Sequence, residues 1–522
     1  MQTGAKLNNL RDLIIRAAEL YPGRDFFLCS DEKFPSVSGA QLFSICKKAV
    51  SVLPYSREKL HIALLGPNSA AWIAAYFAVM SAGHIVVPLH YGMKQDEVKE
   101  ALLQADCDML IFDEQLTGDV EKLSSSIPGL VTCGVHSFIE EAEKAPAGEW
   151  PVIDSDEPAA MYFTSGTTSK SRCVILTHRN LAAQANTLMS VLPLTEEDSG
   201  LSILPLSHTF EMMAYVVGAL HCGGTLYINE SLRSVKANLK RCQPTILVVV
   251  PLILQTLKRE IERTAAKQGR LEELKRGIRL NEKLRRFGIH AGHRLFADIH
   301  ETFGGRLKTI ICGGASLDPE IIRFYRALDI EILQGYGITE CSPVVSVNTL
   351  SGNRPGSIGR ALDCCEVSVI NGEICVRGDS VSPGYYHDEE ANDTSFIDGW
   401  FHTGDLGYKD RDGYLYYTGR IKNLIILSNG ENVSPEEIEE RLYRVDGIRD
   451  ALVYEHDGKI TAEIYADPNK IPDKNAAWKA INPINKSMAQ YKQIGDILLR
   501  DVEFEKTATN KIKRYKNKEG CA

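Results

Sequence analysis

Short apolar runs alternate with stretches of helical character along the first two thirds of the chain. Each run is rich in aliphatic and β-branched residues and is closed by Pro, Gly or a polar residue, at residues 60–65, 109–112, 159–164, 246–250 and 309–312. Runs of this kind, separated by helices, are typical of parallel strands that are buried on both faces. The pattern therefore predicts an α/β body built on parallel sheets.

The apolar segment at residues 71–89 is long enough to be compared with a membrane-spanning helix. Gly83 and His84 interrupt it, and Pro88 lies just before its end. We therefore predict a buried helix at residues 71–80, then a turn and a short buried strand at 85–87, and no transmembrane segment. The N-terminal residues contain no apolar core of a secretory signal peptide, so none is expected.

The pattern changes near residue 345, where shorter strands and tight turns begin. Asn371-Gly372 and Asp412-Gly413 are typical of hairpin turns, and they lie between short strand-like runs at residues 367–370, 373–377 and 414–418. We expect a small antiparallel, barrel-like subdomain over about residues 346–420. Together with the α/β subdomains before it, this subdomain completes a large N-terminal domain over residues 1–420.

The last hundred or so residues have strands and helices of their own, which is enough for a small α+β domain over residues 421–522. No low-complexity linker precedes it, so we expect a tight hinge near Lys422. Ser434 and Pro435 predict the start of a helix, with Ser434 as the N-cap and Glu437 closing a capping box.

Composition narrows the class of protein. The chain has 522 residues, 44% hydrophobic and 24% charged, as in a soluble protein with more than one domain. A formal net charge of −9 disfavours general binding to nucleic acid. The 13 cysteines include no C-x-x-C pair, which predicts reduced thiols, a cytoplasmic location and no zinc site.

One loop combines hydroxyls, a glycine and two cations in the sequence FTSGTTSKSRC at residues 163–173. Hydroxyl donors, close backbone approach at glycine and nearby positive charge suit a polyphosphate. The hydroxyl and glycine candidates are Thr164, Ser165, Gly166, Thr167 and Thr168. The loop does not match a Walker A motif, and a plain Ser/Thr-rich surface turn is the alternative.

Three further segments carry candidate chemistry, and each has a structural alternative. In QGYGITE at residues 334–340, Glu340 could bind Mg²⁺, Thr339 could contact a phosphate oxygen and Tyr336 could lie against a base. The alternative is a corner between a strand and a loop, with Glu340 exposed. In the second segment, Asp405 suits vicinal hydroxyls and Arg420 suits phosphate, whereas a turn cap is the commonest role of such an Asp. The third segment, residues 504–514, is rich in lysine and is typical of solvated surface.

The order and spacing of these segments resemble the acyl-adenylate-forming (AMP-binding) superfamily of acyl-CoA synthetases, peptide-synthetase adenylation domains and luciferases. The resemblance rests on YFTSGTTSKSRCVILTHRNL, LPLSHTFE, CGGASL, QGYGITECSPVVSVN, GWFHTGDLGY, GRIKNLIILSNGENVSPEEIE and EKTATNKIKR. The last two stretches, with RPGSIGRAL, are most similar to the long-chain fatty acyl-CoA synthetase branch. This resemblance implies a small mobile C-terminal lid domain that swings about the hinge.

The resemblance also implies a reaction in two steps, with ATP, CoA and Mg²⁺. A carboxylate attacks the α-phosphate of ATP to give an acyl-adenylate, and a thiol then takes the acyl group. Residues 164–168 would hold the β- and γ-phosphates. The remaining implied nucleotide and catalytic residues are Gly313, Gly314, Ala315, Tyr336, Gly337, Thr339, Glu340 (also the Mg²⁺ ligand), Asp405, Arg420 and the adenylation lysine Lys511.

The acid and thiol sites are implied in the same way. Residues 207–224 would wall the acyl pocket, where His208 gates the pocket, approaches the carboxylate or is structural. The apolar residues after Glu211 suit an alkyl chain, with ordinary helical core as the alternative. Asn429, Gly430 and Glu431 would meet the pantetheine arm of CoA. An acyl-carrier protein carries the same arm, and peripheral membrane contact during collection of fatty acids is left open.

The phosphate loop departs from the family pattern T-S-G-T-T-G-x-P-K-G. Ser169 replaces Gly, Ser171 replaces Pro, Arg172 replaces Lys and Cys173 replaces Gly, while Asn510 replaces the Gly before Lys511. We expect a looser grip on ATP. Three functions follow: a fatty or other apolar acid–CoA ligase, a ligase that acylates a carrier protein, and a non-catalytic nucleotide-binding relative.

Overall fold

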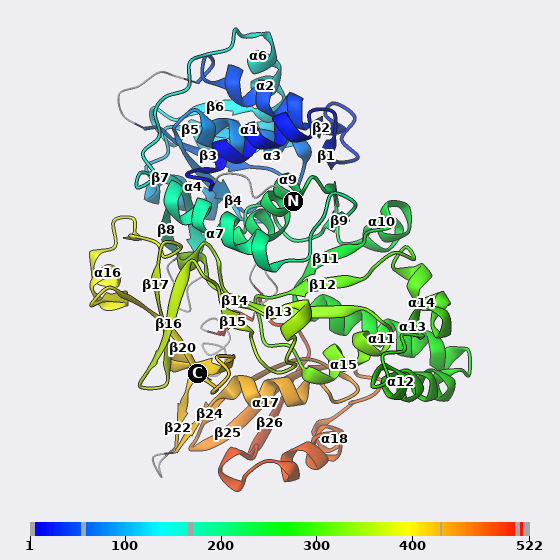
Figure 1. Cartoon of the computed structure of the whole chain (residues 1–522). Coiled ribbons are helices and arrows are strands. Elements are labelled where there is room, and N and C mark those ends of the chain that lie inside the picture. The colour runs from blue at the N-terminus through cyan, green and yellow to red at the C-terminus, as the bar shows by residue number, and fades with distance from the viewer. Residues whose placement is uncertain (1–5, 54–58, 165–170, 428–430, 507–511, 515–522) are drawn as a thin grey trace. The chain divides into compact units, whose positions relative to one another are not determined.

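The computed structural model describes residues 6–53, 59–164, 171–427, 431–506 and 512–514. Figure 1 shows the chain with its helices and strands labelled. The chain divides into two compact units. The first comprises Met1–Thr164, Arg172–Glu366 and Val376–Phe401, and the second comprises Ser165–Ser171, Val367–Cys375 and His402–Ala522. The expected boundary at residue 420 and the hinge at Lys422 stay predictions.

A seven-stranded sheet in the first unit follows the predicted apolar runs. Its order is β18-β8-β7-β4-β3-β5-β6. The members are β3 (His61–Leu65), β4 (Ile85–Leu89), β5 (Met109–Phe112), β6 (Val131–Gly134), β7 (Pro158–Thr164), β8 (Arg172–Thr177) and β18 (Gly384–Tyr385). Strands β7, β4, β3, β5 and β6 pair in parallel, as predicted, and β8 and β18 add an antiparallel edge.

The first unit also contains a nine-stranded sheet, in the order β15-β14-β13-β12-β11-β9-β10-β1-β2. Six central strands pair in parallel, and antiparallel strands close both ends. The strands are β1 (Asp25–Leu28), β2 (Ser36–Ser38), β9 (Ser199–Ser202), β10 (Thr225–Ile228), β11 (Ile246–Val249), β12 (Thr309–Cys312), β13 (Glu331–Gly337), β14 (Val344–Val347) and β15 (Arg360–Ala361). The two sheets confirm the predicted α/β body.

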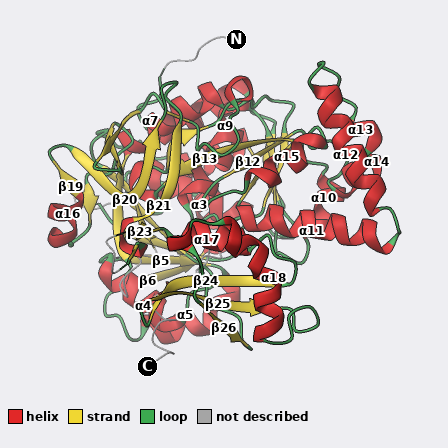
Figure 2. Cartoon of the chain, turned by 90° about the horizontal axis from the view of Figure 1, so that it is seen from below, coloured by secondary structure: helices red, strands yellow, loops and turns green. Residues whose placement is uncertain are grey.

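Helices connect the strands of the first unit (Figure 2). The longer ones are α1 (Leu10–Leu20), α2 (Gly39–Ala49), α3 (Ala70–Ser81), α4 (Gln95–Gln104), α5 (Thr117–Ser124), α6 (Val135–Lys144), α7 (His178–Val191), α10 (Val235–Cys242), α11 (Pro251–Lys267), α12 (Leu271–Arg285) and α15 (Pro319–Ala327). The short ones are α8 (Thr209–Glu211), α9 (Gly218–Cys222), α13 (Gly292–Leu295), α14 (Ala297–Thr302) and α16 (Glu389–Ser395).

Helix α3 explains the apolar segment at residues 71–89. Every residue of α3 is buried, and the Ser69 side chain caps its first turn by accepting from the Trp72 amide. Gly83, in the turn after the helix, has a φ of +86°. Strand β4 follows at once, so the predicted helix, turn and strand are confirmed. Among the residues that the structure describes, no helix is both long and apolar enough to cross a membrane.

An antiparallel sheet of five strands occupies the region where we expected a barrel-like subdomain. It runs β16-β17-β20-β19, with β21 paired to β20. The strands are β16 (Cys365–Ile370), β17 (Glu373–Gly378), β19 (Phe396–Ile397), β20 (Trp400–Lys409) and β21 (Leu415–Arg420). Asn371 and Gly372 both have positive φ, as a tight hairpin between β16 and β17 requires.

The end of the chain forms a small α+β body, as predicted. Strand β24 (Ile448–His456) pairs antiparallel with β25 (Lys459–Ala466), which pairs in parallel with β26 (Asp496–Arg500). A separate hydrophobic core joins this sheet to α17 (Pro435–Leu442) and α18 (Lys474–Ser487). Earlier in the sequence, just before α17, strands β22 (Ile425–Ile426) and β23 (Asn432–Val433) pair antiparallel in a short two-stranded sheet.

The predicted start of α17 is confirmed, but its capping box is not formed. Ser434 is the N-cap and Pro435 the first helical residue. The Ser434 hydroxyl donates to the Glu436 carboxylate at 2.8 Å instead of accepting from a backbone amide. Glu437, the expected partner, instead accepts from Arg441 and Lys492, contacts that the S-x-x-E spacing alone does not reveal.

Candidate functional site

The phosphate loop joins two antiparallel strands: β7 ends at Thr164 and β8 begins at Arg172, and these two residues pair with each other. Ser165, Gly166, Thr167 and Thr168 lie outside the described residues, so their role stays a prediction. The guanidinium of Arg172 lies 5.0 Å from the ring centroid of Tyr385, and its Nε lies 3.5 Å from the Asp388 carboxylate. The cation that replaces the family lysine is thus anchored on the β18 side of the sheet.

Cys173, one of the departures from the family loop, belongs to the core rather than to the loop. Its side chain is buried in the apolar cluster between the parallel strands and their helices, with Sγ 3.6 Å from the sulfur of Met161. Burial raises the pKa of the Cys173 thiol to about 12, so it stays protonated. The exchange of Gly for Cys therefore adds a side chain to the core beside β8.

The segment QGYGITE occupies the carboxyl end of β13, and close packing fixes its glycines. A Cβ on Gly337 would lie 2.1 Å from the Pro343 carbonyl oxygen, and one on Gly335 would lie 3.3 Å from that of Ser346. Strand β14 passes antiparallel to β13 at this point; Ser346 belongs to β14, and Pro343 directly precedes it. Glycine is needed here because the backbones approach so closely, whether or not a ligand binds.

Glu340 follows in a short 3₁₀ turn (Thr339–Cys341) and is held from two sides. The hydroxyl of Tyr385 donates to Glu340 Oε1 at 2.8 Å, and the Ser382 amide donates to the Glu340 carbonyl at 2.8 Å. The pKa of Tyr385 is raised, first by burial and then by the Glu340 charge. Glu340 therefore presents an oriented carboxylate, which is suited to a cation.

Gly313, Gly314 and Ala315 come directly after β12, the parallel neighbour of β13. Cys312 at the end of β12 lies opposite Gln334 of β13, so both glycine segments leave the same edge of the sheet. Gly314 has φ +85°, and a Cβ on Gly313 would lie 3.1 Å from the Phe210 ring. The carboxyl edge of a parallel sheet is the usual place for a nucleotide.

The segment expected to wall the acyl pocket follows β9 and forms an unusual helix. Short α8 begins after His208, whose ring Nδ1 accepts from the Phe210 amide at 3.4 Å, and continues as a π-helix at Met212–Val217. Every side chain of the π-helix is buried, and the Tyr215 hydroxyl donates to the Ile246 carbonyl at 2.6 Å. Sequence periodicity did not predict this π-helix, a feature that is frequent near functional sites.

Glu211 is a buried carboxyl group at the start of this helix. Its Oε1 accepts from the Ser202 hydroxyl at 2.5 Å, whereas Oε2 has no hydrogen-bond partner among the described residues. Burial raises the pKa of Glu211 to about 8, so the group is mostly neutral near pH 7. The segment therefore offers no carboxylate for the ammonium group of an amino acid.

Asp405 and Arg420, both in the second unit, are brought together by sheet register. They lie opposite each other in β20 and β21, and Arg420 Nε donates to Asp405 Oδ1 at 2.7 Å. Asp405 is only 2% exposed. Asp405 is thus a buried carboxylate held by an arginine, and its role toward ribose hydroxyls stays a prediction.

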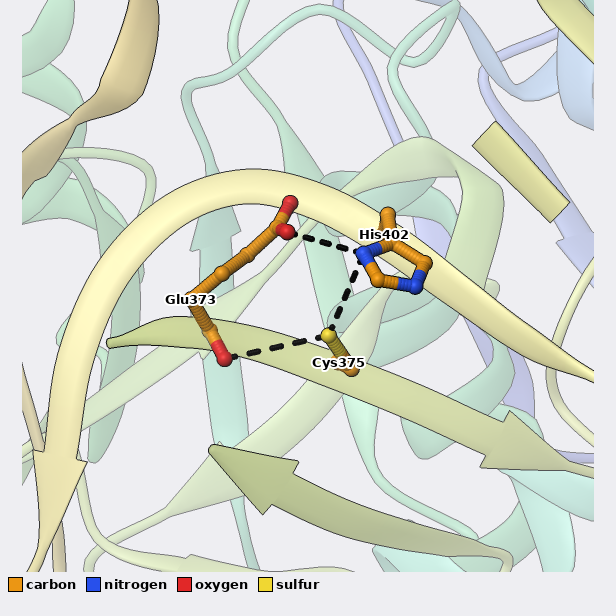
Figure 3. A group of neighbouring side chains, drawn as sticks. All are labelled: Glu373, Cys375 and His402. Carbon is orange, nitrogen blue, oxygen red and sulfur yellow. Dashed lines mark hydrogen bonds and ion pairs between the residues drawn. The ribbon is translucent and has the colours of Figure 1, made fainter. Parts of the chain in front are cut away.

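Glu373 holds the strand segment that carries Asp405 (Figure 3). Its Oε2 lies 2.8 Å from His402 Nδ1, and its Oε1 accepts from the Gly404 amide at 2.7 Å. The Thr403 hydroxyl donates to the Ile374 carbonyl at 2.6 Å and accepts from the Asp405 amide at 3.0 Å. Sequence reasoning missed Glu373 because it lies on a different strand, and only the register reveals the contact.

Glu373, Cys375 and His402 also form a group of three possible metal ligands, whose carboxylate oxygen, thiol sulfur and ring nitrogen lie within 4.8 Å of one another. The same His402 Nδ1 faces both neighbours, Glu373 at 2.8 Å and the Cys375 sulfur at 3.5 Å. Burial raises the pKa of Cys375 to about 11, which keeps the thiol protonated. We therefore interpret the group as a hydrogen-bonded support for β20.

The remaining predicted residues belong to the second unit. Lys511, Asn429 and Gly430 lie outside the described residues. Lys422 lies in a short 3₁₀ turn (Ile421–Asn423) and is exposed, as is Glu431. Their roles at the hinge and in thiol binding stay predictions.

Comparison with known proteins identifies the family. The chain matches the family model described as AMP-binding enzyme over residues 16–386. The long-chain-fatty-acid–CoA ligase FadD15 of Mycobacterium bovis is 28% identical over 443 residues, which cover 79% of this chain and 73% of the relative. The oxalate–CoA ligase of Arabidopsis thaliana is 27% identical over 540 residues, with 97% of both chains covered.

Solved structures agree with this assignment. The o-succinylbenzoate CoA synthetase of Bacillus subtilis, in complex with its acyl-adenylate intermediate, is 25% identical with a TM-score of 0.79, and 97% of both chains is covered. The anthranilate CoA ligase in complex with anthranoyl-AMP shares the fold at 20% identity and a TM-score of 0.81, over 98% of this chain and 97% of the other. Since the family model matches more than half of its length, the chain belongs to the AMP-binding enzyme family.

Proposed function

We propose that this AMP-binding enzyme is an ATP-dependent acid–thiol ligase that joins a fatty or other apolar carboxylate to CoA. Family membership and relatives named as CoA ligases support the assignment. The observation that carries it is the pair of glycine segments at the carboxyl ends of β12 and β13, with Glu340 held beside them by Tyr385.

In the proposed first step, an oxygen of the acid attacks the α-phosphorus of ATP and the bond to pyrophosphate breaks. Thr339 contacts the α-phosphate, and residues 164–168 hold the β- and γ-phosphates. Asp405 accepts from the ribose hydroxyls, and Arg420 fixes its carboxylate. Lys511 supplies positive charge where negative charge grows on the phosphoryl oxygens, which is where fixed cations lower the barrier most.

Glu340 is the proposed ligand of Mg²⁺. Carboxylate oxygens are preferred Mg²⁺ ligands, and the donated hydrogen bond from Tyr385 fixes the orientation of this carboxylate. When bound, Mg²⁺ neutralises charge on the phosphate oxygens of ATP. The residues present fit that ion.

In the proposed second step, the thiol sulfur of CoA loses its proton to solvent and attacks the acyl carbon, the bond between the acyl carbon and the phosphate oxygen breaks, and AMP leaves. Asn429, Gly430 and Glu431 bind the pantetheine arm in this proposal. The C-terminal domain turns about Lys422 between the two steps, so that Lys511 is present for adenylation and withdrawn for thioester formation.

The apolar acid is inferred from the segment after β9. Its π-helix is apolar and buried, and its one acid, Glu211, is mostly neutral near pH 7. Both features suit an acid without an amino group. The relatives act on acids as different as fatty acids and oxalate, so chain length and aromatic preference are matters for experiment.

An acyl-carrier protein is the alternative acceptor, because it presents the same pantetheine arm. Mass spectrometry of thioester products, with ATP, Mg²⁺, a panel of fatty and aryl acids, and either CoA or a holo-carrier protein, tests the choice. We expect acyl-CoA together with one AMP per thioester. Thioester on the carrier alone would favour the alternative, and no AMP with any acid or acceptor would favour a non-catalytic relative.

A further inference from the structure

Large apolar side chains are exposed along the end of α12 and the turn that follows it. Phe287 is 81% exposed, Ile289 51% and Leu280 49%. Helices α12, α13 and α14 lie together in both views (Figures 1 and 2). Such neighbouring exposed residues on a folded protein usually mark an interaction surface.

The same segment is basic in a chain whose net charge is −9. Residues 271–295 carry seven Lys and Arg against three Glu, a net charge of +4. Arg285 is turned inward to Asp329 and Glu331, so it does not contribute to the surface. Exposed cations remain at Arg276, Arg279, Lys283, Arg286 and Arg294.

Helical spacing places cations and apolar side chains on one outer face. Arg276, Leu280, Lys283 and Phe287 follow one another at intervals of four, three and four residues, and so share a face. The opposite face of α12 is accounted for, because Leu271, Leu274 and Ile278 join the core cluster around β11 and β12. The outer face thus presents exposed apolar side chains between basic ones and does not pack against this core cluster.

We propose that this outer face, defined as Arg276, Arg279, Leu280, Lys283, Arg286, Phe287 and Ile289, docks on an anionic membrane surface. Phe287, Leu280 and Ile289 enter the boundary between headgroups and acyl chains, and the surrounding cations meet lipid phosphates. The charge pattern favours this occupant over a second copy of the chain, since two such faces would bring like charges together. The proposal does not depend on the ligase activity.

Flotation of the full chain with vesicles tests the proposal. Vesicles of phosphatidylcholine mixed with phosphatidylserine are compared with phosphatidylcholine alone, at low and high salt. We expect binding to the mixed vesicles only, weakened by salt. Each cation near an anionic surface changes the partition several-fold, so Lys283→Glu with Arg286→Glu should lower it more than about tenfold. Phe287→Ser should lower it by a similar factor.

Matched controls separate this face from general stickiness. Val152→Ser changes an apolar residue that is 95% exposed elsewhere in the first unit, and Lys240→Glu with Arg241→Glu makes the same double charge reversal on α10, where both side chains are exposed. Both controls should bind vesicles like the unchanged protein, and all variants should keep its thermal midpoint. The proposal would be overturned if the protein bound neutral and anionic vesicles equally, or if the face variants bound as well as the unchanged protein. Self-association or carrier-protein binding through this face, without vesicle binding, would overturn it as well.

Discussion

At the scale of single residues, the position of Asp405 depends on a residue outside the expected site. Both oxygens of Glu373 are used, one on His402 and one on the Gly404 amide. The hydroxyl of the neighbouring Thr403 both donates and accepts a hydrogen bond. If Asp405 binds the ribose hydroxyls, Glu373 is a positioning residue for nucleotide binding.

Glu373→Gln tests this role. The amide keeps the size of the side chain but loses the charge that holds His402, so Asp405 should shift. We expect the KM for ATP to rise about tenfold, since hydrogen bonds to charged groups contribute roughly 1.5–3 kcal/mol. Discrimination between ATP and 2′-deoxy-ATP, measured as the ratio of kcat/KM, should fall with it.

The control for this prediction is Glu366→Gln on the preceding strand, where the carboxylate is exposed and bonds Arg377. It should leave both quantities unchanged. A Glu373→Gln protein that discriminates against 2′-deoxy-ATP as the unchanged enzyme does would show that the support is structural only.

At the scale of elements, a buried hydrogen bond between Ser202 and Glu211 ties β9 to α8. The folded protein raises the pKa of Glu211 to about 8, above its ordinary value of 4.5. The folded state therefore holds a proton that the unfolded chain releases more readily. Stability from this group is present at low pH and is lost as the pH rises from about 4.5 through about 8.

Glu211→Gln should remove that pH dependence, because the amide is neutral throughout. We expect the variant to have a thermal midpoint close to that of the unchanged protein at about pH 5, and a higher one at about pH 9. Glu197→Gln, an exposed change in the same region, should track the unchanged protein. A constant gap between Glu211→Gln and the unchanged protein from acid to alkaline pH would contradict the raised pKa.

The elements that sequence patterns predicted well are those whose burial is uniform. The run at residues 109–112 is β5, and the apolar segment at 71–80 lies inside α3, because both are enclosed on all sides. The π-helix after Glu211 was not predictable. Its geometry depends on contacts with other strands. The Tyr215 hydroxyl bonds the Ile246 carbonyl, and the Tyr215 side chain fits beside Gly200 only because that residue has no Cβ.

At the scale of the whole molecule, the order of motifs predicted the fold class and the family before any side chain was placed. The family model covers residues 16–386, and the match to the oxalate–CoA ligase of Arabidopsis thaliana extends over 97% of the chain. Sequence also predicted the pairing partners Asp405 and Arg420 as site residues, but not that they face each other. Register between β20 and β21 decides that contact, and no local pattern records it.

The central claim is that this protein forms an acyl-adenylate. Carboxylate-dependent exchange of labelled pyrophosphate into ATP measures that step alone, over short to long fatty acids and a few aryl acids. We expect exchange with one class of apolar acid, and a loss of roughly a hundredfold in Lys511→Ala, as when a group that stabilises the transition-state charge is removed. No exchange with any of these acids, in folded protein that binds ATP, would contradict the account.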